Sequence, residues 1–248
     1  MTGFLPFSSF ERSILLMLIA CLFCLEINAQ TPVKKHAEGF AYEELVTGNT
    51  NNKDLPLLIA FHYSAGTPAE SFKDYDALGL PVRIIVVKGS YVKRTGFSYF
   101  PVNYYSFDNA TQVKLAKQTV DSLASFIKHI TQLYKVKPVV SGISQGGDIS
   151  FLLGIHYPEL LRASFPFAAV IRPEAAEFVS SAARNTLPIF AYQGEADKIV
   201  NVNDTREQVN KLKAYLNIQL TTYEGLGHDI SPEMKKDYSL LMRKLLSK

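Results

Sequence analysis

Short apolar runs alternate with longer segments of helical periodicity along most of the chain. Residues 55–61 and 82–87 are almost continuously apolar, which is typical of strands buried on both faces of a parallel sheet. Similar short runs recur downstream and predict further strands of the same kind. These runs cover residues 136–141, 163–170, 188–192 and 218–223.

The segments between these runs have the spacing of amphipathic helices. Residues 111–134 place apolar side chains every three or four positions, and residues 203–216 and 233–246 do so more loosely. Ser231 and Pro232 suit the cap and first turn of the last helix. The alternation predicts an α/β fold: a doubly wound, mostly parallel sheet flanked by helices, in a single domain over residues 30–248. Ligands should gather at the carboxyl ends of its strands.

The N-terminus is typical of an export signal. Residues 13–25 form an apolar run after Arg12, too short for a membrane span of about 20 residues. Ala29 then suits a signal-peptidase site. We expect a signal peptide over residues 1–29 and a periplasmic or secreted protein. Two alternatives stay open: an uncleaved anchor, and a lipoprotein cut before Cys21.

Cleavage after Ala29 would remove both cysteines, Cys21 and Cys24. The remaining 219 residues then contain no cysteine, which excludes disulfides, Cys-ligated metals and thiol catalysis. The leader contains one basic and two acidic residues, which leaves 25 basic and 21 acidic side chains, a net charge of +4. Because these charges are dispersed, we expect no nucleic-acid partner and no stable membrane insertion after cleavage.

Residues 142–146 read Gly-Ile-Ser-Gln-Gly, directly after one predicted strand and before a helical stretch to about residue 157. This G-x-S-x-G pattern needs that context, because its glycines allow the sharp turn that lifts a serine hydroxyl above the sheet. The sequence therefore predicts Ser144 as a nucleophile.

A serine hydroxyl needs a base to accept its proton. Of the five histidines, His228 lies in a glycine-containing loop between the last predicted strand and the last helix. Most histidines are structural, but this position follows Ser144 in the chain order Ser, Asp, His that this fold requires. We predict His228 as the general base.

The third member of a triad should follow a strand between these two residues. Glu195 and Asp197 both do so, and Asp197 stands at the usual position. Asp197 would orient His228 and stabilise its protonated form. Glu195 is the fallback, and in a second interpretation either carboxylate only caps the helix after Asn203.

These motifs together resemble the phospholipase/carboxylesterase family of α/β-hydrolases, which includes acyl-protein thioesterase-like serine esterases. The likeness rests on residues 57–62, 142–147, 193–200 and 227–232 in the same order. It implies hydrolysis of a small-molecule or lipid ester, or a thioester, through an acyl-enzyme. No metal or organic cofactor is implied.

The chain departs from the family at one loop. Members usually have His-Gly-x-Gly after the third strand, whereas residues 62–66 read His-Tyr-Ser-Ala-Gly. Stabilisation of an oxyanion needs two donors. We predict the amides of Gln145 and Ser64, with Tyr63 as the alternative to Ser64. The Tyr63 ring either constrains this loop, covers the acyl pocket or simply packs.

Residues 91–107 are rich in aromatic side chains and follow a predicted strand. Loops at this edge of the sheet often bind substrate, so we predict that Phe97, Tyr99 and Phe100 line a substrate groove. A packed surface loop is the alternative.

Two other functions remain open from the sequence: a peptidase of the prolyl-oligopeptidase type, and a non-catalytic binding protein of the same fold. The three triad candidates argue against the second. Acyl and alcohol specificity, ester or thioester preference and oligomeric state are not fixed by the sequence.

Overall fold

The computed structural model describes residues 31–48, 54–172, 174, 179 and 186–247. The predicted signal peptide over residues 1–29 lies outside the described residues and stays a prediction.

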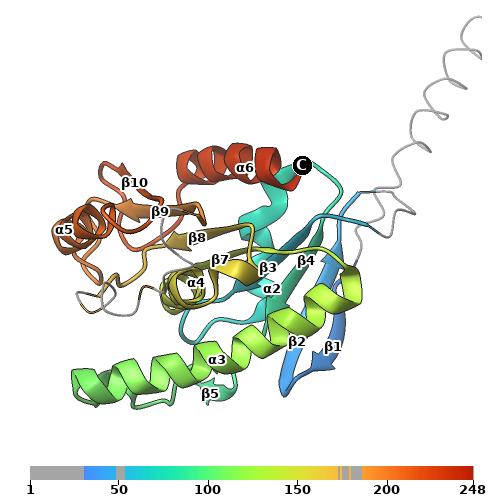
Figure 1. Cartoon of the computed structure of the whole chain (residues 1–248), viewed down its shortest axis with the longest axis horizontal. Coiled ribbons are helices and arrows are strands. Elements are labelled where there is room, and N and C mark those ends of the chain that lie inside the picture. Colours follow the sequence, from blue (N-terminus) through green and yellow to red (C-terminus); the bar gives the residue numbers. More distant parts are fainter. Residues whose placement is uncertain (1–30, 49–53, 173, 175–178, 180–185, 248) are drawn as a thin grey trace, which may run out of the picture. The chain divides into compact units, whose positions relative to one another are not determined.

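An eight-stranded sheet forms the centre of the described part of the chain (Figure 1). Its strand order is β1-β2-β4-β3-β7-β8-β9-β10, and β2 pairs antiparallel with both β1 and β4 while the other pairs are parallel. The predicted fold class, a mostly parallel sheet flanked by helices, is confirmed. The strands are β1 Val33–Ala37, β2 Phe40–Val46, β3 Leu57–Phe61, β4 Arg83–Val87, β7 Val139–Ile143, β8 Ala163–Phe167, β9 Ile189–Gly194 and β10 Ile218–Tyr223.

Helices cover both faces of this sheet (Figure 1). α3, α4 and α5 pack on one face, and α6 packs with the 3₁₀ segment η1 on the other. A short hairpin of β5 (Tyr91–Lys93) and β6 (Gly96–Ser98) lies apart from the main sheet. The helical segments are α2 Pro68–Ser71, η1 Phe72–Leu78, η2 Tyr104–Ser106, α3 Asn109–Tyr134, α4 Gln145–His156, η3 Pro158–Leu160, α5 Val202–Leu212 and α6 Pro232–Leu246.

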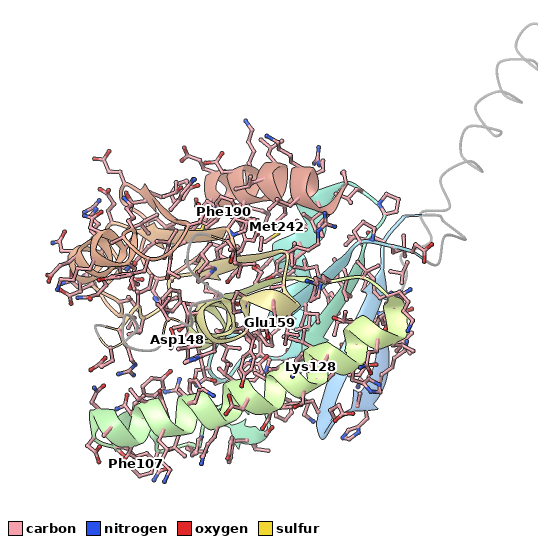
Figure 2. All side chains as sticks on the ribbon, in the orientation of Figure 1. Phe107, Lys128, Asp148, Glu159, Phe190 and Met242 are labelled. Carbon is pink, nitrogen blue, oxygen red and sulfur yellow. The ribbon has the colours of Figure 1, made fainter. Side chains whose placement is uncertain are left out.

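The alternation of side chains along each strand divides the core into two layers. Leu57, Ile59 and Phe61 of β3 face α3 and α4, whereas Leu58 and Ala60 face η1 and α6. Every residue of β3 is buried, as expected for a central strand covered on both sides. Exposed side chains such as Lys128 lie on the outer surface of α3 (Figure 2).

Each predicted strand and helix is found, with ends that differ by a few residues, whereas β1, β2 and the hairpin in the aromatic segment 91–107 are not among the predicted elements. The helix predicted over residues 111–134 spans Asn109–Tyr134, and the strand predicted over 218–223 is found there. The segment expected as a loop instead begins with the β5–β6 hairpin, whose turn holds Arg94 at a φ of 53°. Strands of three residues are too short to show a periodic pattern.

Within the described residues, no helix is long and apolar enough to cross a membrane.

Candidate active site

Ser144 occupies the sharp turn between β7 and α4. Its backbone has a φ of 56° and a ψ of −119°, a strained conformation for a residue with a side chain. Its N–H donates to the Phe167 carbonyl on the neighbouring strand at 2.9 Å, which holds the turn against the sheet. Gly146 passes so close to the Phe61 carbonyl that a Cβ there would clash. The G-x-S-x-G sequence therefore forms the sharp strand-to-helix turn that the pattern predicts.

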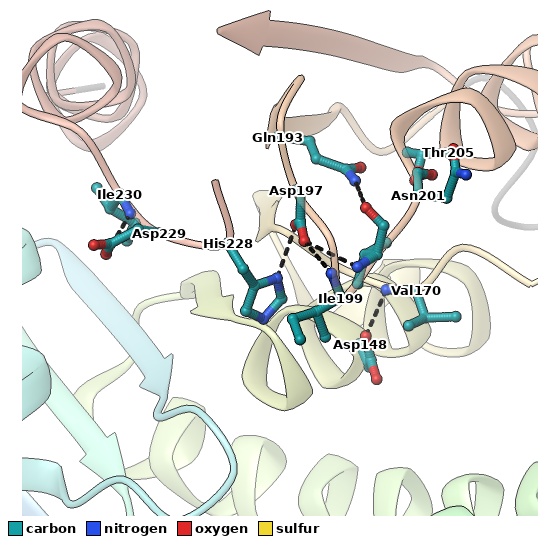
Figure 3. Close-up of polar contacts among 11 residues, drawn as sticks. Asp148, Val170, Gln193, Asp197, Ile199, Asn201, Thr205, His228, Asp229 and Ile230 are labelled. Carbon is teal, nitrogen blue, oxygen red and sulfur yellow. Dashed lines mark hydrogen bonds and ion pairs between the residues drawn. The ribbon is translucent and has the colours of Figure 1, made fainter. Parts of the chain in front are cut away.

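His228 and Asp197 are joined by a hydrogen bond (Figure 3). His228 Nδ1 lies 2.8 Å from Asp197 Oδ2, and the Asp197 side chain is completely buried while that of His228 remains 20% exposed. The other Asp197 oxygen accepts hydrogen bonds from the amides of Ile199 and Val200, at 2.8 and 2.9 Å. These contacts fix the Asp197 carboxylate, which in turn orients the His228 ring. His228 Nε2 is then available to form a hydrogen bond with another group.

The fallback carboxylate, Glu195, has different partners. It forms an ion pair with Arg206 and accepts a hydrogen bond from Thr222 at 2.8 Å. The cap of α5 is Asn201, whose side chain accepts from the Asn203 amide. The structure thus places Asp197, and not Glu195, against His228, and neither carboxylate is the cap of α5.

Ser144 and His228 are both partly buried. In the described residues no hydrogen bond joins the two side chains. Catalytic hydrogen bonds are often long before substrate binds and shorten in the complex. We therefore expect the hydrogen bond between Ser144 and His228 to form when substrate binds.

The loop after β3 forms a tight turn over residues 63–66. The Gly66 N–H donates to the Tyr63 carbonyl at 2.9 Å, and Ala65 takes a φ of 71°. The Ala65 amide donates to the Phe97 carbonyl at 2.8 Å. By contrast, the amides of Tyr63 and Ser64 have no acceptor among the described residues, and the Gln145 amide is the first of α4 and has no intrahelical partner. Within the described residues, the predicted oxyanion donors therefore have no protein acceptor.

His62 fixes the orientation of the peptide between Tyr63 and Ser64. The Gly89 amide donates to its Nε2 at 3.0 Å, so Nδ1 carries the proton and donates to the Tyr63 carbonyl at 2.7 Å. Since the carbonyl and N–H of a trans peptide point in opposite directions, this contact aims the Ser64 N–H away from His62. Burial lowers the pKa of His62 to about 4, which keeps the ring neutral in this tautomer.

Tyr99 connects this histidine with Gln145. Its ring stacks on His62 with centroids 4.6 Å apart, its hydroxyl accepts from the His62 amide at 3.1 Å, and it donates to the Val87 carbonyl. The Tyr99 amide in turn donates to the Gln145 side chain at 2.8 Å. The first turn of α4 and the loop after β3 are therefore held together through one buried tyrosine.

The three predicted substrate residues occupy different environments. Phe97 is partly buried under Lys88 and pairs with Gly66, whereas Tyr99 is 2% exposed and belongs to the network above. Phe100 lines a cavity and stacks on Tyr104 with centroids 4.2 Å apart. Tyr63 is 40% exposed, its ring lies over Gly66, and its hydroxyl donates to Glu70 at 3.3 Å. Their roles toward substrate stay predictions.

The cavity lies between α3 and α4; its volume is about 40 Å³, and the empty space counted out into open solvent at its mouth is about 550 Å³. Sequence reasoning missed its most unusual residue, Asp148, which is 9% exposed and lies one turn after Ser144 on α4. Burial raises the pKa of Asp148 to about 7. An acidic residue in the first turn of a helix is common, so its presence in the sequence does not indicate a cavity. The apolar wall consists of Phe100, Val113, Ala116, Phe151, Leu152 and Val170.

Within the described residues, no group of three or more His, Cys, Asp or Glu side chains is arranged to hold a metal ion.

Residues 86–245 match the model of the family described as Phospholipase/Carboxylesterase. The chain belongs to the phospholipase/carboxylesterase family. This α/β-hydrolase is also 27% identical over 114 residues to the putative carboxymethylenebutenolidase of Aquifex aeolicus strain VF5. That match spans 45% of this chain and 47% of the relative, so it covers about half the length of the relative.

Solved structures of carboxylesterases share the fold of this family member. The Bacillus cereus carboxylesterase has a TM-score of 0.65 at 16% identity, covering 82% of this chain and 94% of its own. The Mesorhizobium loti carboxylesterase has a TM-score of 0.68 at 14% identity, covering 87% and 98%. At such low identity these likenesses establish the α/β-hydrolase fold alone.

Proposed function

We propose that this chain is a serine esterase that hydrolyses carboxylic esters, or thioesters, through an acyl-enzyme, with Ser144 as nucleophile, His228 as general base and Asp197 as the residue that orients His228. The observation that carries the proposal is the 2.8 Å hydrogen bond between Asp197 and His228, in a protein whose G-x-S-x-G serine occupies a strained elbow. Membership of the phospholipase/carboxylesterase family supports the same chemistry.

In the proposed mechanism, His228 Nε2 removes the proton of Ser144 Oγ as the oxygen attacks the ester carbonyl. Asp197 holds Nδ1 and stabilises the resulting imidazolium without taking its proton. His228 then gives the proton to the departing alcohol. A water molecule, deprotonated by the same histidine, attacks the acyl-enzyme and releases the carboxylic acid, which restores Ser144.

The negative charge that develops on the carbonyl oxygen would be stabilised by the amides of Gln145 and Ser64. Both lack a protein acceptor among the described residues, and the Gln145 amide also lies at the positive end of the α4 dipole. The contacts of His62 and Gly66 with the Tyr63 carbonyl would hold the Ser64 amide in place before substrate arrives. Donors fixed in advance are the effective ones, because the protein need not reorganise during the reaction.

The triad assignment is tested by the hydrolysis of a panel of p-nitrophenyl esters from acetate to palmitate. We expect Ser144→Ala to abolish turnover and Asp197→Asn to lower kcat on the order of 10⁴-fold, as in other serine hydrolases, while Glu195→Gln, the matched control on the same loop, keeps most of the activity. Faster cleavage of peptide anilides than of esters would instead favour a peptidase. A Glu195→Gln loss as large as that of Asp197→Asn would contradict the assignment.

We also propose export with cleavage after Ala29. Expression of the full chain in a bacterial host and N-terminal sequencing of the purified protein test this. Gln30 is expected as the first residue, whereas a lipid-modified Cys21 would indicate a lipoprotein and an intact N-terminus an uncleaved anchor.

A further inference from the structure

We propose that the cavity between α3 and α4 binds the acyl group of the substrate, and that Asp148 selects acyl groups that carry a hydroxyl. This inference rests on the proposed esterase function and adds the substrate class. It stands on three observations: the position of the cavity beside the nucleophile's helix, the oxygens on its wall that lack partners, and the engagement of its cations elsewhere.

The cavity runs along α4 from the nucleophile. Asp148, Leu152 and His156 follow one another at intervals of four residues on one helix face, which gives a slot about 12 Å long beginning one turn from Ser144. The Asp148 amide donates to the Ser144 carbonyl at 2.9 Å, so its first turn is rigidly connected to the elbow. An acyl group attached to Ser144 would reach Asp148 about 6 Å further along the helix.

Tyr105 links the cavity with the proposed oxyanion hole. Its hydroxyl lies 3.5 Å from Gln145 Nε2, and the Lys93 ammonium lies 5.3 Å from its ring while donating to Ser64 Oγ at 2.8 Å. Burial, and then the nearby Asp148 carboxyl, raise the pKa of Tyr105 to about 12. Tyr105 does not line the cavity itself, but its neighbour Tyr104 does, so this tyrosine pair lies between the cavity and the loop that would hold the carbonyl of the ester.

The polar atoms that remain without partners in the cavity are acceptors. Asp148 Oδ1 accepts from the Val170 amide at 2.7 Å, and its Oδ2 has no donor among the described residues. Glu174 Oε2 is also buried without a hydrogen-bond partner there. A buried polar atom without a partner costs free energy, so a ligand that supplies a hydrogen bond would be favoured over one that does not.

The cations of the cavity are already engaged. Arg172 donates to Asn109 at 2.8 Å and to Gln112 at 2.6 Å, and Lys117 forms a 2.5 Å ion pair with Asp121. The Arg172 partners are neutral amides, so Arg172 keeps its positive charge, but a carboxylate on the ligand would also have to lie against Asp148 and the buried Glu174 Oε2. An ammonium group would approach Arg172 and lose its hydration in a largely apolar slot. A neutral hydroxyl can donate to Asp148 without the charge repulsion that a carboxylate or an ammonium group would meet. Because the walls of the cavity include aromatic rings, we expect this hydroxyl to be attached to an aryl ring.

The first test compares p-nitrophenyl para-hydroxybenzoate with p-nitrophenyl benzoate. The ratio of their kcat/KM values is expected to fall about tenfold in Asp148→Ala, because one hydrogen bond is lost, and to stay constant in Asp76→Asn, a matched loss of an exposed acid on the opposite face. Dividing the two rates within each variant removes the different intrinsic reactivities of the esters. An unchanged ratio in Asp148→Ala would overturn the proposal.

The second test measures binding without catalysis, by calorimetry on Ser144→Ala. Para-cresol is expected to bind about tenfold more tightly than toluene, and the additional change Asp148→Ala should erase that difference. Equal binding of the two probes, or tighter binding of benzylamine than of para-cresol, would contradict the hydroxyl assignment. If the wild type cleaves no ester of the acetate-to-palmitate panel either, the proposed function fails, and the calorimetry still tests whether the cavity prefers a hydroxyl.

Discussion

Glu44 and Asp148 are both buried carboxylates, but their surroundings differ. Glu44, 6% exposed on β2, accepts hydrogen bonds from Lys35 at 2.9 Å, from Tyr134 at 2.7 Å and from Arg83. Asp148, on α4 one turn after Ser144, has one backbone donor and one oxygen without a partner among the described residues. Their pKa values move in opposite directions: hydrogen bonds and nearby cations lower that of Glu44 despite its burial, whereas burial raises that of Asp148 to about 7.

The number of hydrogen-bond partners distinguishes the two carboxylates: Glu44 is structural, whereas Asp148 can still accept a hydrogen bond from a ligand. The Glu44 network joins β1, β2, β4 and the end of α3, and the Arg83 guanidinium lies 3.8 Å above the Tyr134 ring. Every oxygen there has a donor, so nothing remains for a substrate. Asp148 is buried with hydrogen-bonding capacity to spare, which costs stability and is therefore expected where function requires it.

The largest effect is expected at Glu44. Glu44→Ala should lower the free energy of unfolding by about 3 kcal/mol, because Arg83, only 13% exposed, would lose the carboxylate that compensates its charge. Lys35→Met, which removes a 37% exposed partner of the same carboxylate, should cost less than about 1 kcal/mol. Urea denaturation at pH 7 measures both. Similar losses of unfolding free energy in Glu44→Ala and Lys35→Met would mean that burial does not determine the energetic cost of removing a charge from this network.

A second test concerns His62, which is buried and fully partnered like Glu44 but lies at the site. His62→Ala should lower kcat about 10–100-fold with little change in KM, because the Ser64 amide loses its alignment. His62→Asn places an amide N–H near the position of Nδ1 and should recover part of kcat. If His62 is only structural, the two variants will lose stability without a specific fall in kcat.

The smallest effect concerns the pH dependence of stability at Asp148. Its folded pKa lies above its unfolded value of 3.8, so the unfolded state releases this proton first and stability falls as the pH rises from about 4 to about 7. Asp148→Asn cannot ionise. Its stability relative to wild type should therefore be greater at pH 8 than at pH 4. Thermal unfolding across this range tests the sign, and an equal difference at both values would contradict it.

Sequence reasoning found the features that depend on local pattern. Ser144 and His228 are predicted because G-x-S-x-G and the loop before the last helix have recognisable contexts; the structure shows the expected sharp turn at Ser144, and the catalytic roles stay predictions. The sheet was predicted from buried strands such as β3, whose apolar run is continuous. The antiparallel strands β1 and β2 at the sheet edge were not resolved from their mixed polar and apolar sequence.

Features that depend on packing between distant segments were not predictable. Glu195 and Asp197 occur on the same loop, and only the direction of each side chain distinguishes them. His62 is not distinctive in sequence, because its role comes from Gly89 and Tyr99, which lie 27 and 37 residues away. Asp148 faces a cavity only because α3 and the segment after β8 pack around it.

The central claim, an activated serine at position 144, is tested most directly by reaction of the purified protein with a fluorophosphonate, followed by mass spectrometry of the modified peptide. The account predicts one adduct on Ser144, no adduct in Ser144→Ala, and slower labelling in His228→Ala. A folded wild-type protein that is not modified, or that is modified at another residue, would contradict the account and favour a non-catalytic binding protein.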